Sequence, residues 1–513
     1  MKEITANIII NEAVQRVGTG SNFSVGEALS LLVAYYNSIH QKYRDNYERY
    51  KASEEGTPIF SRELADFMKV NNKVNNSFVS EIVDTKQGYM IGIPVTYSLS
   101  SGALNVTKKS PEEVLSETEE NNKITSQLIR LQKSTNLHDL NMETIKKTSI
   151  CGTSSRLLFV SKSSSNALDV TDIKAVNVEP WETIFIYDRT GLDLLVAIRY
   201  YYINVLSDND SVKAKLKLEI YDKTSIYYYV ENDNSTFDID TSEELNPRTH
   251  LFDNVPLFEF KNNNERQGDC DKVLALIDTY DKTVSDLSSE LEQFRLAYIA
   301  LFGLKASKAD LDKLRQTGMF EMTKEGKVEF VTKDINIDQI MSYLNKLENN
   351  IVRFAKSVNF KDENFYGNLS GIAIRYKLMQ LEEKAMTTQV KFEVADSYMW
   401  KLLEPMLNFI SNIEFSYLYI ERQFTRNIPV NLLEEARIQT ELEGSVSTKT
   451  RLSVASFVQN ADIEYQELLE EKKLHKKLGV DIVAGNDVTK ARLVDLEAGG
   501  PTNRNTNGTV EGQ

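Results

Sequence analysis

The feature that most restricts the fold is a long apolar repeat within residues 269–303. Its members follow one another at alternating steps of four and three residues: Val273, Ile277, Tyr280, Val284, Leu287, Leu291, Phe294, Tyr298 and Leu301. A spacing of about 3.5 residues is typical of a helix that packs along its whole length against other helices. Asp269 can cap the start of this helix, and Gly303 can end it in the left-handed conformation. At about 1.5 Å per residue the rod would be roughly 50 Å long, so we expect it to pack between copies of the chain.

A second rod begins at Asn336 and repeats the same spacing up to Val358. Residues 304–335 separate the two rods, and their segment FEMTKEGKVEFV predicts a hairpin around Glu325-Gly326. Two rods joined in this way predict a hairpin of helices with a small unit at its tip. The apolar repeats together predict a subunit interface made of Val273, Ile277, Tyr280, Val284, Leu287, Leu291, Phe294, Ile340, Leu344, Leu347 and Ile351.

The rest of the chain mixes helical and extended patterns. Helical periodicity covers residues 24–51, 71–84 and 111–149, whereas residues 156–230 hold short β-branched and aromatic runs separated by turn signals, as in an antiparallel sheet. A long helix should begin after Ser370 and continue past Pro405, with a strand and further helices up to residue 478. The remaining segment has little to bury, and we expect residues 480–513 to be disordered. The fold class predicted is α+β.

Composition and motifs exclude several classes of function. A net charge of -15 argues against a broad surface that grips nucleic acid. The two cysteines are far apart and favour a reducing compartment. No apolar run is long enough for a membrane span or a signal peptide. P-loop, nucleophile-elbow and metal-ligand spacings are absent, and the acidic pair Asp362-Glu363 is better explained as solvated loop carboxylates. We therefore expect no catalytic residue, no metal and no cofactor.

Two features of the sequence, one polar and one aromatic, each allow two interpretations. The face of the second rod opposite its apolar residues carries Asn345, Lys346, Asn349, Arg353 and Lys356. It is either a solvated helix face or, in a ring of such rods, a set of bands of positive charge around a pore. The run Tyr200-Tyr201-Tyr202 either packs on a sheet face, which we favour, or forms a platform for stacking bases.

Three segments resemble the portal proteins of long-tailed bacteriophages of the siphovirus type. They are IVDTKQGYMIGIPVTY, with its Gly-x-Pro, then VPLFEFKNNNERQGDCDKVLALIDTYDKTVSD, and NFKDENFYGNLSGIAIRYKLMQLEEKA. The order of elements agrees over about residues 20–480, and the last two segments are fairly specific together. The resemblance implies a portal fold with long stem helices, an α/β wing, a small clip and a helical crown.

Carried over to this chain, the resemblance implies a set of regions. They are the wing (1–268), stem helix 1 (269–303), the clip (304–335), stem helix 2 (336–357), the tunnel loop (358–369), the long wing helix with its strand (370–428), the crown (429–479) and a tail (480–513). The residues expected to line the DNA channel are Lys346, Asn349, Arg353, Lys356, Lys361, Asp362, Glu363 and Asn364.

The implied function is a ring, usually of twelve copies, at one capsid vertex. Double-stranded DNA would enter and leave through its channel without sequence-specific binding. The implied partners are the terminase large subunit, the head-completion adaptor, the tail, and the major capsid and scaffolding proteins, with no membrane. The implied location is the virion, and the host cytoplasm during assembly. The alternatives are a non-viral helical scaffold or coiled-coil interaction protein and, less favoured, an enzyme with an unrecognised site.

Overall fold

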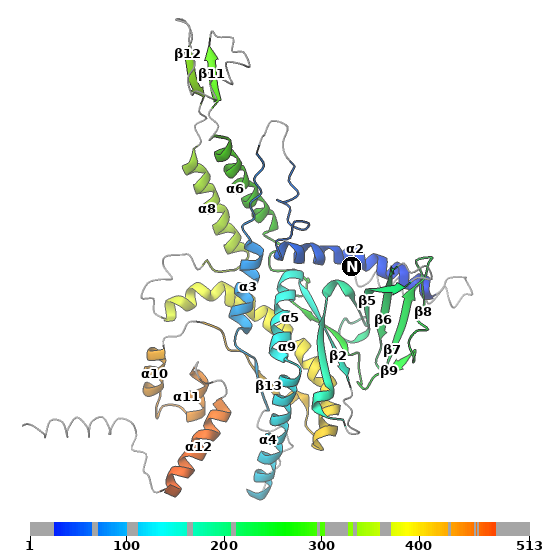
Figure 1. Cartoon of the computed structure of the whole chain (residues 1–513). Helices are drawn as coiled ribbons and strands as arrows, with labels where there is room; N and C mark the ends of the chain where they lie inside the picture. Colours follow the sequence, from blue (N-terminus) through cyan, green and yellow to red (C-terminus); the bar gives the residue numbers. More distant parts are fainter. Residues whose placement is uncertain are drawn as a thin grey trace, which may run out of the picture. The chain divides into compact units, whose positions relative to one another are not determined.

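The computed structural model describes residues 25–63, 70–99, 111–161, 168–206, 212–294, 298–302, 327–331, 336–359, 371–428, 432–455, 458 and 461–478. The chain divides into two compact units, Met1–Ile428 and Pro429–Gln513. Figure 1 shows the helices and strands of both units, coloured along the sequence.

The helices of the first unit are α2 (Val25–Tyr50), α3 (Phe78–Ile91), α4 (Pro111–Ser134), α5 (Leu137–Cys151), α6 (Leu274–Phe294), α8 (Ile337–Phe354) and α9 (Gly371–Ser411). Its strands are β1 (Thr96–Leu99), β2 (Thr153–Val160), β3 (Ile173–Val178), β4 (Thr183–Tyr187), β5 (Leu194–Leu206), β6 (Val212–Tyr221), β7 (Ser225–Glu231), β8 (Phe237–Ile239), β9 (Arg248–Thr249), β10 (Leu257–Lys261), β11 (Tyr298–Phe302), β12 (Lys327–Val331) and β13 (Ile420–Gln423). Short 3-10 turns include Pro180–Glu182, which leads into β4. The predicted mixture of helices and strands is confirmed.

All the strands pair in antiparallel fashion, in four sheets among the described residues. The largest has the order β4-β5-β6-β7-β8, with β9 also paired to β7. The others are β10-β2-β3, β1-β13 and β11-β12. One face of the large sheet is covered by α2, whose Leu29, Leu32 and Val33 pack on Ile198 and Leu218 (Figure 1). The main core lies elsewhere, where α9 packs on β10 and β2.

Helix α6 is shorter than the rod predicted for residues 269–303, and the prediction is wrong at both ends. At the start, the carboxylate of Asp269 does not cap the helix, because it accepts hydrogen bonds from Lys86 and Asn262. At the far end, Tyr298–Phe302 is the strand β11, paired in register with β12 from Tyr298↔Val331 to Phe302↔Lys327. Tyr298 and Leu301 continue the apolar repeat but do not continue the helix.

The sequence predicts that residues 327–331 pair with the segment just before Glu325-Gly326. In the structure, residues 327–331 pair with residues 298–302. The segment KVEFV forms β12, and its described partner is β11, from the far side of residues 303–326. Residues 320–326 lie outside the described residues. The second rod is close to its prediction: α8 begins after Asn336, whose side chain accepts a hydrogen bond from the backbone N–H of Gln339.

The helix predicted over residues 71–84 begins only at Phe78, because the preceding residues run as an extended strap along α6. We call residues 70–77 the strap. The backbone N–H groups of Asn72, Val74 and Asn76 donate to Ser289 Oγ (2.9 Å), Ser285 Oγ (2.9 Å) and Asp281 Oδ1 (3.0 Å). Alternate residues of an extended chain advance by about 6.5–7 Å, close to the rise over four helical residues, so the two spacings match.

The second unit contains α10 (Leu432–Glu441), α11 (Thr448–Val454) and α12 (Ala461–Leu478). Ser447 caps α11 by accepting a hydrogen bond from the N–H of Thr450, and Gln439 Nε2 donates to the carbonyl of Arg451. The helices predicted after residue 429 are therefore confirmed. Their role as a crown remains a prediction.

The strap predicts a measurable contribution of the α6 serines. Replacing both Ser285 and Ser289 by alanine removes the acceptors for two strap N–H groups, and each group left unpaired costs about 1–3 kcal/mol. We expect faster amide hydrogen exchange at Asn72 and Val74 and a lower thermal midpoint. The matched control is Thr279→Ala, because the Thr279 hydroxyl donates only along its own helix, to the carbonyl of Ala275. Equal exchange rates in the two variants would contradict the strap.

Candidate DNA channel and subunit interface

Helix α8 separates an apolar side from a polar side along its length. Leu344, Leu347 and Ile351 are buried, whereas Lys346, Asn349, Arg353 and Lys356 are exposed. We call these last four residues the α8 polar face. They recur at steps of three and four residues, so they share one side of the helix, with Lys356 just past its end. The sequence predicted this division, and the structure confirms the helix that carries it.

The α8 polar face carries positive charge with little local compensation. Lys356 Nζ lies 3.3 Å from Glu383 Oε2 on α9, with both side chains about half exposed. Among the described residues, no carboxylate lies within ion-pair distance of Lys346 or Arg353. An exposed pair such as Lys356–Glu383 contributes about 1 kcal/mol or less, so it fixes Lys356 only weakly. The other expected channel residues, Lys361, Asp362, Glu363 and Asn364, lie outside the described residues.

The predicted interface residues are distributed over different environments. Val273, Ile277, Leu344, Leu347 and Ile351 are buried within the single chain. Tyr280, Val284, Leu287 and Ile340 are partly buried, and Leu291 is 47% exposed. The side chain of Phe294 lies outside the described part of the structure.

The buried part of the repeat is covered by the chain's own N-terminal half. Val273, Ile277 and Ile351 belong to a cluster with Tyr43 of α2, Val79 and Ile82 of α3 and Ile150 of α5. These positions therefore have partners before a second copy is added. That the repeat also lies between copies stays a prediction.

Exposed apolar side chains gather instead on α9. Tyr376 (73% exposed), Met379, Met386, Val390 and Val394 (67% exposed) recur at helical spacing. We call them the α9 stripe. The opposite side of the same helix is buried through Leu381, Ala385 and Phe392. This stripe was not predicted from the sequence, although the sequence carries its signal. The residues of α9 are apolar on two opposite sides, and a helix of this kind needs a partner for each side.

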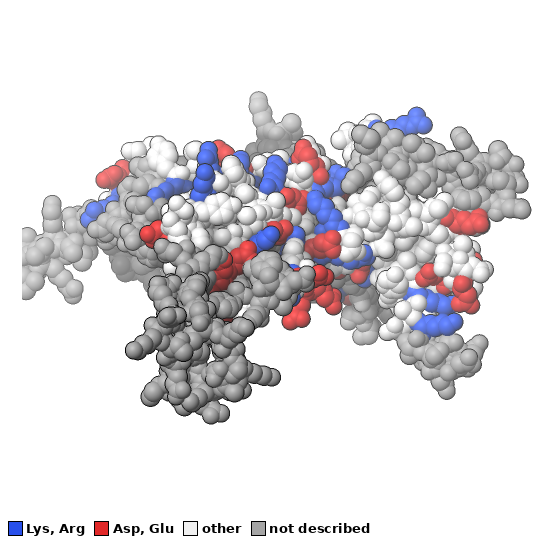
Figure 2. Space-filling view, turned by 90° about the horizontal axis from the view of Figure 1, so that it is seen from above, with Lys and Arg blue, Asp and Glu red and all other residues white. Residues whose placement is uncertain are grey.

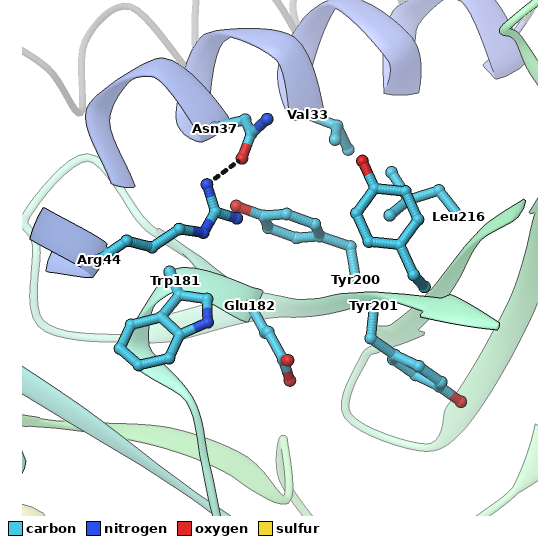
Figure 3. A pocket seen from close by; sticks show the side chains of 9 residues that line it. Val33, Asn37, Arg44, Trp181, Glu182, Tyr200, Tyr201 and Leu216 are labelled. Carbon is cyan, nitrogen blue, oxygen red and sulfur yellow. Dashed lines mark hydrogen bonds between the residues drawn. The ribbon is translucent and has the colours of Figure 1, made fainter. Parts of the chain in front are cut away.

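A cavity of about 250 Å³ lies between α2, the Pro180–Glu182 turn and β5, lined by Val33, Asn37, Arg44, Trp181, Glu182, Tyr200, Tyr201, Tyr202 and Leu216 (Figure 3). Arg44 Nη1 donates to Asn37 Oδ1 over 2.7 Å. Tyr200 is buried, its hydroxyl 2.8 Å from His40 Nδ1, whereas Tyr202 is 69% exposed. Tyr200 thus packs on the sheet face as favoured above. A base-stacking platform gains no support, because only Tyr202 of the three is largely exposed.

Charges on the visible surface are mixed. On the face in Figure 2, basic and acidic side chains are interleaved over the coloured part of the molecule. Within the described residues, no group of three or more histidine, cysteine, aspartate or glutamate side chains is placed to hold a metal ion. None of the described helices is long and apolar enough to cross a membrane.

Comparison with known proteins decides the family. A sequence model of the phage portal proteins, described as SPP1 Gp6-like, matches residues 30–477. The chain belongs to this portal protein family. It is 24% identical over 464 residues to the portal protein of Bacillus phage SPP1, covering 87% of this chain and 84% of that relative. It is 24% identical over 444 residues to the portal protein of Clostridium phage phiCD119, and this match covers 83% of this chain and 91% of that relative.

The match confirms the resemblance stated from the three sequence segments. It also decides against a non-viral helical scaffold, because the portal family covers most of the chain. Membership of the portal family does not show which surfaces contact DNA or neighbouring copies, so the roles of the α8 polar face and the α9 stripe do not follow from it.

The burial of the apolar repeat within one chain makes a prediction. Ile351→Ala in this portal protein should lower the free energy of unfolding by about 2–5 kcal/mol, because it opens a cavity in a cluster that the chain completes alone. The change should persist in dilute protein that forms no oligomer. The control is Phe354→Ala on the same helix, where the side chain is 53% exposed. If Ile351→Ala were silent in dilute protein, the repeat would depend on a second copy.

Proposed function

We propose that copies of this chain form a closed ring, of twelve as the resemblance implies, at one capsid vertex. DNA passes through the ring during packaging and ejection, and the ring docks the terminase and later the head-completion and tail proteins. The observation that carries the proposal is the division of α8. Its apolar side is used within the chain, which leaves the α8 polar face available to line a channel.

Electrostatics suit passage better than binding. Lys346, Arg353 and Lys356 give each copy a few positive charges, while the whole chain carries a net charge of -15. Each phosphate that a protein neutralises adds affinity for DNA, so a dense basic lining would hold the duplex in place. Sparse basic residues, repeated around a ring, keep the duplex centred while it slides.

The α9 stripe supplies a surface for the neighbouring copy. A ring of identical subunits uses two different patches on each copy and leaves no open edge. Each apolar side chain of the stripe contributes about 1.5–3 kcal/mol when it is fully buried. Tyr343 and Phe354 on α8, about half exposed, offer a second apolar surface. This proposal moves the main contact between copies from the α6 repeat to α9 and α8.

The regions implied by the resemblance can be given the bounds of the observed helices and strands. We propose that α6 and α8 form the stem. We assign β11 to the clip together with β12, because the two strands pair with each other. Residues 1–268 and 370–428 form the wing, residues 358–369 the tunnel loop, and the second unit the crown.

Reversing charge on the α8 polar face tests the channel. Lys346→Glu with Arg353→Glu should leave rings intact but reduce nuclease-protected DNA per particle several-fold in a complementation test, because the lining would repel phosphate. The control is Lys213→Glu with Lys223→Glu, which makes the same charge change at exposed positions on β6 and in the turn between β6 and β7. Wild-type DNA content in the α8 variant would exclude this face from the channel.

Charging the α9 stripe tests the ring. Met386→Asp with Val390→Asp would bury unpaired charge between copies, at a cost of several kcal/mol per site. Analytical ultracentrifugation should then show monomers or small oligomers in place of rings. Gln380→Asp with Thr387→Asp adds the same charge at exposed polar positions of α9 and should assemble normally. Normal rings from the Met386 and Val390 variant would remove α9 from the interface.

A further inference from the structure

Asp269 is buried and contacts four other segments of the first unit, three through its carboxylate and one through its backbone N–H. Lys86 Nζ of α3 lies 3.0 Å from Asp269 Oδ2, and Lys384 Nζ of α9 lies 3.4 Å from the same oxygen. Asn262 Nδ2 donates to Asp269 Oδ1 over 2.9 Å. The backbone N–H of Asp269 donates to the carbonyl of Ser149 in α5 over 2.7 Å. We call this cluster the Asp269 junction, and it lies where the chain approaches α6.

Lys384 also holds the end of α8. Its Nζ donates to the carbonyl of Ala355 over 2.7 Å, at the residue that follows the last residue of the helix. A cation near this position satisfies a carbonyl without a helical partner and interacts favourably with the helix dipole. One side chain therefore connects α9 both to the end of α8 and to the start of the α6 segment.

The two lysines of the Asp269 junction differ in how they can leave it. The Lys86 side chain is 0% exposed, and its ammonium also donates to Asn262 Oδ1 over 2.8 Å. Burial lowers the pKa of Lys86 to about 8 although Asp269 lies beside it. The Lys384 side chain is 13% exposed and so has a route to solvent. If the Lys86 side chain moved away from Asp269, its ammonium would stay buried without a counter-ion. If the Lys384 side chain moved away, its ammonium could reach solvent.

The carboxylate stays paired in either case. Burial favours the neutral form of Asp269, but Lys384 and Lys86 outweigh it and hold the pKa of Asp269 below its usual value. If Lys384 swings out, Lys86 and Asn262 remain in contact with the carboxylate. The large cost of an unpaired buried charge is therefore avoided.

We propose that Lys384 is a releasable latch that positions the end of α8 on α9, with Lys86 as the permanent counter-ion of Asp269. Releasing the latch breaks one hydrogen bond at Ala355. Among the described residues, the exposed Lys356–Glu383 pair and the burial of Val358 in the core cluster that includes Leu378 and Leu381 then still connect the end of α8 with α9. In the ring proposed above the latch would set how the stem meets the wing, and that clause alone rests on the proposed function.

The test is amide hydrogen exchange on the purified full-length protein. Lys384→Met keeps the aliphatic length but removes the donor, so the last-turn amides of Ala355, Lys356 and Ser357 should exchange about tenfold faster while the thermal midpoint changes little. Lys384→Arg, which keeps a charged donor, should restore slow exchange. Lys86→Met should instead lower the thermal midpoint, because it removes the buried counter-ion of Asp269, and should leave those amides protected.

The comparison separates a latch from a purely stabilising ion pair. A stabilising role would make Lys384→Met and Lys86→Met lower the thermal midpoint together and raise exchange throughout the unit, which would overturn the proposal. Unchanged exchange at the end of α8 in Lys384→Met would overturn it as well. If Lys384→Met did not fold, Lys384→Ala, which also lacks the donor to the Ala355 carbonyl, would replace it with the same expected local effect. None of these readouts requires ring formation or DNA.

Discussion

The constraint on which the structure depends is that one side of a helix can be buried only once. The apolar repeat of α6 and α8 predicts burial, and the chain provides much of it through α2, α3 and α5. The α9 stripe and one flank of α8 stay exposed, and these are the surfaces that we propose for contacts between copies. The α8 polar face stays exposed to solvent, because α8 buries its apolar side within its own chain.

Polar groups on α6 and just before it fix how the rest of the chain is attached. Asp281, Ser285 and Ser289 form a row at spacing four that binds the strap through backbone N–H groups. Asp269 contacts α3 and α9 through its carboxylate and α5 through its backbone N–H. Both arrangements bury polar atoms, which is costly unless these atoms are paired. The strap acceptors are hydrogen-bonded, whereas Asp269 Oδ2 has no hydrogen-bond partner among the described residues and lies within ion-pair distance of Lys86 and Lys384. The helix is thus held by polar contacts as well as by apolar packing.

These features give the portal assignment a physical content that family membership alone does not supply. The family match says what kind of protein this is. The distribution of burial shows which surfaces stay exposed, and we propose that these meet DNA and neighbouring copies. In the same proposal, the Asp269 junction is the place where α8 can change its position on α9 without leaving an unpaired buried charge.

The sequence alone determined the existence of α8 and α9, the helices after residue 429, the antiparallel strands of residues 156–230 and the polar face of α8, because each depends on local periodicity or capping. It did not determine where α6 ends, since Tyr298 and Leu301 fit both a helical repeat and a strand, and only pairing with β12 selects the strand. It also did not reveal the strap or the role of Asp269. Asn72, Val74, Lys86 and Lys384 are far from their partners in the chain, and no local pattern records such hydrogen bonds. The tertiary structure decided these contacts, because a buried donor or acceptor pairs with whichever complementary group the folded chain brings within reach.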